Sequence, residues 1–198
     1  MIISHKYKFI CLNPPKTGSE TREVMFNEFS DINVHKFLDL KLWKECPSIR
    51  HLNYKQMINF CKIFKIEYEK YFIFTFVRNP WERIESWYNM KSKQDSSWKL
   101  NYPSFFRFIN THIDESRWQD NYINNELNYI GSLENIKEDI DYLFNYLKIK
   151  EKKIQVHKNK SVELGKVNIK KLWTDDLINF VKEKEKNTIK LKKYAYIS

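Results

Sequence analysis

Two strand–loop–helix units constrain the fold of this 198-residue chain more than any other feature of its sequence. In the first, the apolar run Tyr7–Leu12 ends at an Asn-Pro-Pro turn, and apolar residues then recur at helical spacing. In the second, Tyr71–Val77 is apolar on both faces and precedes a helical pattern from Trp81 to Met90. Such strands are typical of a parallel sheet that helices cover. The sequence therefore predicts an α/β fold with a mostly parallel sheet.

The rest of the chain continues this alternation without an internal repeat or a linker. We expect 1–198 to form a single domain, because its length suffices for one hydrophobic core. Four further helices and one possible short strand are predicted: Tyr54–Phe64, Pro103–Ile113, Ile136–Leu147 and Asp175–Lys186 as helices, and Asn33–Leu38 as the strand.

Cysteine usage and hydropathy predict the compartment. Cys11, Cys46 and Cys61 are far apart and include no C-x-x-C pair, so we expect free thiols in a reducing compartment. The first residues lack the pattern of a secretory signal, and no apolar run approaches the roughly 20 residues that span a bilayer. The sequence thus predicts a cytoplasmic protein without a membrane partner.

The chain is basic, with 35 Lys and Arg against 25 Asp and Glu and a formal charge of +10. This balance favours an anionic ligand, such as a phosphorylated cofactor, an acidic glycan or a nucleic acid. Alternatively, the charge reflects only a chain rich in Lys, Asn and Ile. Where the basic residues lie in the fold distinguishes these two interpretations. The Lys-rich run 182–193 is expected to be the solvated face of a helix rather than a nucleic-acid patch.

The loop after the first strand has the features of a phosphate site. Pro15-Lys16-Thr17-Gly18 lies between a buried strand and the start of a helix. There, successive N–H groups and the helix dipole can bind a phosphate, with Gly18 allowing close approach and Lys16 adding a point charge. The Walker A pattern is absent. A plain strand-to-helix turn with a solvated lysine is the alternative.

A second candidate phosphate-binding segment follows the second strand. Arg78 comes directly after the strand, and Ser86 lies two turns into the following helix, so a guanidinium and a hydroxyl can reach one phosphate. Alone, Arg78 could merely end a strand. Together, the two segments place two phosphate sites on two strands of one sheet, at their carboxyl ends.

These segments resemble the sulfotransferases that use 3′-phosphoadenosine-5′-phosphosulfate (PAPS), in particular the carbohydrate branch. The first loop is similar to the family's 5′-phosphosulfate loop and the second segment to its 3′-phosphate motif. Later segments resemble the family in the same order, so that the similarity covers nearly the whole chain: Ile130–Ile136 with Asp139, His157–Ser161, Thr174–Asp176 and Tyr194–Tyr196.

The resemblance implies a P-loop-like sheet flanked by helices, PAPS as cofactor, and transfer of its sulfuryl group to a hydroxyl or amine of a small-molecule or glycan acceptor. It assigns Lys16 a catalytic role on the phosphosulfate, and Arg78 and Ser86 the 3′-phosphate. The remaining cofactor-binding residues that it implies are Thr17, Gly18, Ser19, Glu20 and Thr21 around the 5′-phosphate, and Lys158, Asn159, Lys160 and Ser161 near the nucleotide. No metal site is implied.

Three positions depart from the family pattern. Glu20 stands where Thr is usual, and we expect only its backbone to face the phosphate, with the carboxylate turned away. Ser19 replaces a Gly, and Leu133 replaces an Arg.

The catalytic base is predicted to be His51, in a segment that resembles several sulfotransferases of this branch. A base must take the acceptor's proton. A surface histidine that caps a helix is the alternative, and Glu23 or Glu28 are the next candidates. The other candidates considered are His5, His35, His112, His157 and Glu20.

The sequence is also compatible with a specific acceptor class and with two other classes of function. Aromatic and basic residues between 89 and 129 suit a sugar acceptor, but Phe105, Phe106 and Ile109 could equally form the core face of a helix. A nucleotide-dependent phosphotransferase with a degenerate loop is disfavoured, because no Walker A Lys-Ser/Thr and no acidic magnesium site are visible. A non-catalytic nucleic-acid-binding module is the alternative from another class.

Overall fold

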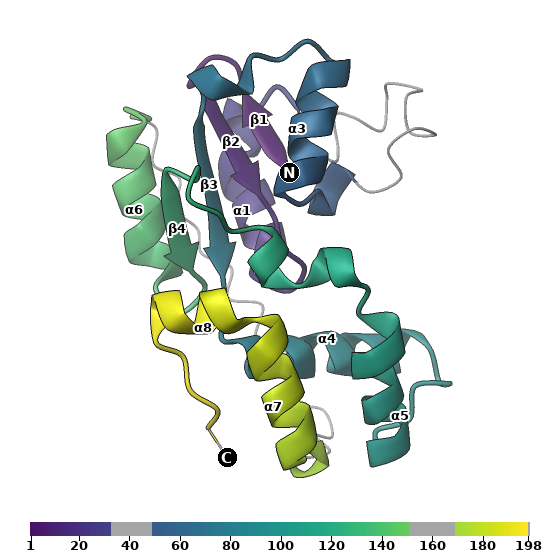
Figure 1. Ribbon diagram of the computed structural model, residues 1–198. Helices are drawn as coiled ribbons and strands as arrows, with labels where there is room; N and C mark the ends of the chain where they lie inside the picture. Colours follow the sequence, from purple (N-terminus) through teal and green to yellow (C-terminus); the bar gives the residue numbers. More distant parts are fainter. Residues whose placement is uncertain (33–48, 151–168, 198) are drawn as a thin grey trace.

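The computed structural model describes residues 1–32, 49–150 and 169–197. A four-stranded sheet lies at its centre, in the order β1-β2-β3-β4 (Figure 1). β1 (Ile2–Ser4) is antiparallel to β2 (Phe9–Leu12), whereas β2, β3 (Phe72–Val77) and β4 (Tyr129–Ser132) are parallel. The predicted α/β fold with a mostly parallel sheet is confirmed.

The two outer strands were not predicted. β1 has only three residues and β4 only four, and the Tyr-Ile-Gly-Ser sequence of β4 is too short to show a strand pattern. The two inner strands lie within the predicted runs and begin one or two residues later. The possible strand at Asn33–Leu38 lies outside the described residues.

Seven α-helices are described: α1 (Ser19–Phe26), α3 (Tyr54–Ile63), α4 (Pro80–Gln94), α5 (Tyr102–Arg107), α6 (Ile136–Tyr146), α7 (Asp175–Lys184) and α8 (Lys186–Lys192). The helix predicted over Pro103–Ile113 is α5 followed by a π-helical turn, Phe108–His112. The helix predicted over Asp175–Lys186 ends earlier, because Glu185 separates α7 from α8. Short 3₁₀ turns occupy Asn27–Phe29, Ile49–His51, Tyr68–Lys70, Glu115–Arg117, Gln119–Asn121 and Ile169–Leu172.

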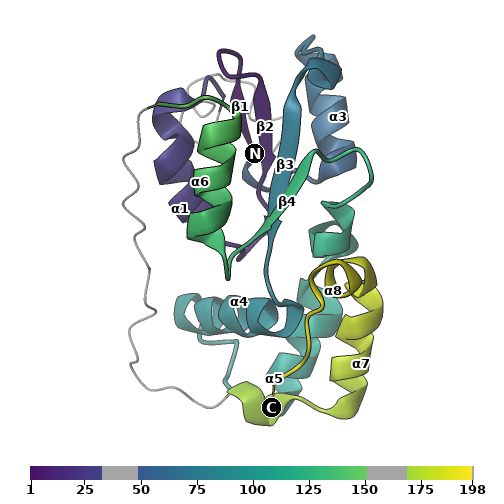
Figure 2. The same cartoon turned by 90° about the vertical axis from the view of Figure 1, so that its left-hand side faces the viewer.

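Helices cover both faces of the sheet (Figure 2). α1 and α6 pack on one face, where Phe9, Phe74 and Phe76 are fully buried. α3 packs on the other face, against Ile10 and Ile73. Alternate residues of the inner strands thus belong to two separate cores, which explains why these strands are apolar on both faces.

A second group of helices, α4, α5 and α7, lies beyond the carboxyl ends of the parallel strands (Figure 1). Its core is aromatic and includes Trp87, Phe105 and Phe108. Phe105 and Ile109 are core residues, as one of the two interpretations of this segment expected, whereas Phe106 is 47% exposed. Because the parallel strands end toward this layer, the loops that leave β2, β3 and β4 lie between the sheet and these helices (Figure 1).

None of the described helices is long and apolar enough to cross a membrane.

Candidate functional site

The loop after β2 is shaped by two left-handed residues. Lys16 has φ 64° and Gly18 has φ 82°. A Cβ at Gly18 would lie 2.7 Å from Cδ1 of Leu133, so both backbone conformation and space require glycine there. The hydroxyl of Thr17 donates to the carbonyl of Pro14 at 2.8 Å and closes the loop. α1 begins at Ser19, and the first N–H groups of a helix have no acceptor within it.

The side chain of Lys16 is half-buried and reaches α4, where its Nζ lies 3.6 Å from Sδ of Met90. Burial lowers the pKa of Lys16; Glu20 raises it, and the charges of Arg78 and Arg50 lower it further. Lys16 therefore shares one electrostatic environment with two arginines. Glu20 has a 68% exposed side chain and lies 3.9 Å from Arg50.

Arg22 on α1 was missed by the sequence analysis, although its side chain is fully buried under the loop. Its Nε donates to Oδ1 of Asn13 at 3.0 Å, and its Nη2 donates to the Thr17 hydroxyl at 2.9 Å. The available signal was its helical spacing from Met25 and Phe26, which places a charged residue on the buried face of α1.

Arg78 follows β3, and its backbone is held at two points by one side chain. The Arg78 N–H donates to Oε1 of Gln119 at 2.8 Å, and Nε2 of Gln119 donates to the Arg78 carbonyl at 3.0 Å. The Arg78 guanidinium is partly exposed and lies 3.3 Å from Glu82. Because Leu12 of β2 pairs with Thr75 of β3, the loops that carry Lys16 and Arg78 leave neighbouring strands at the same edge.

The start of α4 fixes Ser86 relative to Arg78. Asn79 caps the helix by accepting from the N–H groups of Trp81 and Glu82, and Pro80 occupies its first position. The Asn79 N–H donates to Oε1 of Glu134 at 2.8 Å, and the hydroxyl of Tyr194 donates to Oε2 of the same carboxylate. Ser86 is half-buried on this helix.

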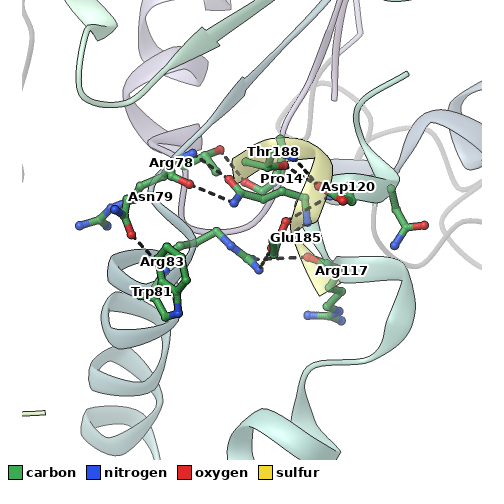
Figure 3. Close-up of polar contacts among 12 residues, drawn as sticks. Pro14, Arg78, Asn79, Trp81, Arg83, Arg117, Asp120, Glu185 and Thr188 are labelled. Carbon is green, nitrogen blue, oxygen red and sulfur yellow. Dashed lines mark hydrogen bonds and ion pairs between the residues drawn. The ribbon is translucent and has the colours of Figure 1, made fainter. Parts of the chain in front are cut away.

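A buried ion pair between α4 and the junction of α7 and α8 is connected to the Arg78 segment through Gln119 (Figure 3). Arg83 and Glu185 are both fully buried, with Nη2 and Oε1 2.6 Å apart. Glu185 also accepts from the backbone N–H of Gln119 at 3.1 Å. The chain of contacts therefore runs from the junction of α7 and α8 through Gln119 to Arg78. No local sequence pattern indicates these contacts, because Gln119 lies 41 positions from Arg78 and 66 positions from Glu185.

His51 is anchored to the first loop. Its Nδ1 lies 2.7 Å from the backbone carbonyl of Asn13, and its own carbonyl accepts from the hydroxyl of Tyr122. A carbonyl can only accept, so Nδ1 carries the proton and Nε2 keeps its lone pair. Burial lowers the pKa of His51 to about 3, despite the hydrogen bond to Asn13. The imidazole is therefore neutral at physiological pH with Nε2 unprotonated, and the same burial makes it a weaker base than an exposed histidine.

The other candidate bases are placed less favourably. Glu23 is 5% exposed, and its two carboxylate oxygens accept from Nε and Nη2 of Arg50 at 2.8 and 2.7 Å, so both oxygens are already engaged. His5 is exposed and bonds to Tyr71, while His112 stacks on Phe108 in the helical layer. Glu28 is exposed. His35 and His157 lie outside the described residues, as do Lys158, Asn159, Lys160 and Ser161.

The described residues fit an anion with two charged groups. The loops after two neighbouring parallel strands each contribute a cation, Lys16 and Arg78. The buried Nδ2 of Asn13 has no hydrogen-bond partner within the described ranges, so one donor at the base of the loop is open. In those same ranges, no three His, Cys, Asp or Glu side chains cluster as metal ligands would. Cys11 and Cys61 are free and buried; Cys46 is not among the described residues.

Comparisons with known proteins assign the family. The model of the Sulfotransferase family matches residues 1–191. Among solved structures, mouse sulfotransferase SULT7A1 complexed with PAP is similar in fold, with a TM-score of 0.52 and 14% sequence identity over 98% of this chain and 91% of that one. No curated protein matches the sequence. Because the family model covers almost the whole chain, the chain belongs to the sulfotransferase family.

Proposed function

We propose that this chain transfers the sulfuryl group of PAPS to a hydroxyl or amine of a small-molecule or glycan acceptor, with a carbohydrate hydroxyl as the first choice. The observation that carries the proposal is that Lys16 and Arg78 lie in the loops after two neighbouring parallel strands, with a neutral His51 bonded to the first of these loops. Family membership supports sulfuryl transfer. A related fold complexed with PAP supports the choice of nucleotide.

Each phosphate site would use the groups described above. Lys16, the N–H groups of residues 17–21 and the hydroxyls of Ser19 and Thr21 would hold the 5′-phosphosulfate. The hydroxyl of Thr17, which the family resemblance also implied, instead donates to Pro14 and accepts from Arg22, so only the backbone of Thr17 would take part. Arg78 and Ser86 would hold the 3′-phosphate. The carboxylate of Glu20 lies on the surface, so only its backbone would take part. Lys158, Asn159, Lys160 and Ser161 are proposed near the nucleotide on the family resemblance alone.

When bound, PAPS would supply an activated sulfuryl group, and adenosine 3′,5′-bisphosphate would be the product. Nε2 of His51 would accept the proton of the acceptor hydroxyl as its oxygen forms the new bond to sulfur. Lys16 would hold the phosphosulfate and place its charge near the phosphate oxygen on which negative charge builds. Positioning and electrostatic stabilisation do most of the work in such group transfers.

The proposal predicts selectivity for a nucleotide with two phosphates. Adenosine 3′,5′-bisphosphate should raise the melting temperature more than adenosine 5′-phosphate at equal concentration, since only the former reaches both sites. Arg78→Ala should abolish the difference, because it removes a charge-assisted contact worth about 1.5–3 kcal/mol. Thermal denaturation with each nucleotide measures this. Equal shifts in the unsubstituted protein would refute the 3′-phosphate assignment.

Activity should not depend on added divalent metal. Lys16, Arg78 and the N–H groups of the loop already provide the positive field at the phosphates. The measurement is the rate of sulfuryl transfer with and without EDTA. Loss of the rate in EDTA and its return with magnesium would instead favour a phosphotransferase that uses a metal ion.

A further inference from the structure

Arg22 holds the loop after β2 from its core side. Its guanidinium binds three acceptors in that loop, namely Oδ1 of Asn13 and both the hydroxyl and the carbonyl of Thr17. Its Cζ also lies 4.8 Å from the centre of the Phe76 ring on β3. Each of the three guanidinium nitrogens thus donates to an acceptor in the loop.

In the part of the chain that the structure describes, no carboxylate forms an ion pair with the Arg22 guanidinium, although Glu23 is near enough to interact with its charge. Its acceptors are neutral, and the adjacent Glu23 is committed to Arg50. Arg83 shows the usual arrangement, because its equally buried guanidinium contacts Glu185. An arginine cannot release its proton to avoid the cost of burial. A persistent positive charge therefore lies directly beneath the loop.

The contact with Thr17 transmits this charge to the anion-facing side of the loop. The Thr17 carbonyl and the Gly18 N–H belong to one peptide group, so a cation on the carbonyl polarises the group and strengthens the N–H as a donor. The Cβ position of Gly18 lies 3.6 Å from Nη1 of Arg22, which places the guanidinium immediately behind the glycine. An anion in the loop would offset the charge of Arg22, which is itself fully buried.

We propose that Arg22 is a positioning residue for the 5′-phosphosulfate, which fixes the loop through Asn13 and Thr17 and whose buried charge supplies part of the affinity for the anion. This inference rests on the proposed function. It differs from the role of Arg78 in that Arg22 acts on the 5′ group through the loop, and is therefore independent of the 3′-phosphate.

Two substitutions separate charge from hydrogen bonding. Arg22→Gln retains amide donors but removes the charge, whereas Arg22→Lys retains the charge with a smaller set of donors. We expect Arg22→Gln to weaken adenosine 5′-phosphate and adenosine 3′,5′-bisphosphate by the same factor, about tenfold. Arg22→Lys should stay within about threefold of the unsubstituted protein. Titration calorimetry measures both affinities, and circular dichroism checks that each variant folds.

Lys182→Gln is the matched control. It removes one positive charge from an exposed position on α7 and should leave both affinities unchanged, which excludes an effect of net charge. Unchanged affinities in Arg22→Gln would overturn the inference, as would a loss confined to the bisphosphate. If Arg22→Gln does not fold, Arg22→Lys decides, and weakening beyond threefold refutes the role of charge. Absence of bisphosphate selectivity in the unsubstituted protein would instead contradict the proposed function, while the effect of Arg22 on adenosine 5′-phosphate remains measurable.

Discussion

His51→Ala is expected to lower the rate of sulfuryl transfer by about 10²–10⁴-fold while leaving the affinity for adenosine 3′,5′-bisphosphate unchanged. The substitution removes the proton acceptor at Nε2 but no proposed phosphate contact. Hydroxylated sugars must first be screened with labelled PAPS to find an acceptor. His5→Ala is the control, because that histidine is exposed and bonds to Tyr71 instead of the loop. A variant with full activity would place the base elsewhere, and Glu23 and Glu28 would be tested next.

The dependence of rate on pH gives a second test of the same residue. An ordinary histidine would lose half its basic form at about pH 6.5. The pKa of His51 is about 3, so its contribution to the rate should stay constant from about pH 8 down to about pH 5. Stability, in contrast to the rate, should depend on pH in this range. The unfolded chain binds a proton on this histidine near pH 6.5, whereas the folded chain does not. The free energy of unfolding therefore falls as the pH decreases from about 6.5 toward about 3.

Glu185→Ala should reduce the free energy of unfolding by about 3–5 kcal/mol, because it leaves the buried guanidinium of Arg83 without its partner. Urea denaturation measures the loss. The matched control is Glu115→Ala on the ion pair with Lys184, which is exposed, with Glu115 77% accessible. That variant should lose less than about 1 kcal/mol.

Combining Arg83→Met with Glu185→Leu distinguishes the ion pair from simple packing. Replacing both charges by apolar side chains of similar size is often neutral, so the double variant should be more stable than Glu185→Ala. Equal losses in Glu185→Ala and Glu115→Ala would contradict a special role for the buried pair.

The parts of the fold that sequence predicted are those with local signals. β2 and β3 were readable because both of their faces are buried, which produces continuous apolar runs. β1 and β4 were not readable, because each is too short for a pattern, and β4 in addition forms through pairing with a strand that is distant in sequence.

The residues of the candidate site also differ in whether a local sequence signal indicates them. Lys16 and Arg78 could be selected because each lies in the segment that follows a predicted strand. Gln119 and Glu185 could not, since they act only through contacts that the tertiary structure creates. Arg22 is the intermediate case, because its position in α1 was readable but its neutral acceptors were not.

The two hydrogen bonds between the Gln119 side chain and the Arg78 backbone couple this segment to local unfolding. Gln119 is itself held by Glu185, at the junction of α7 and α8, so a transient detachment of these two helices would release the Arg78 backbone. Nucleotide binding at Arg78 and detachment of the helices would then disfavour each other, and thermodynamic linkage makes this coupling reciprocal. Amide hydrogens of α7 and α8 would thus exchange more slowly with solvent in the nucleotide complex, although they lie outside the phosphate-binding loops.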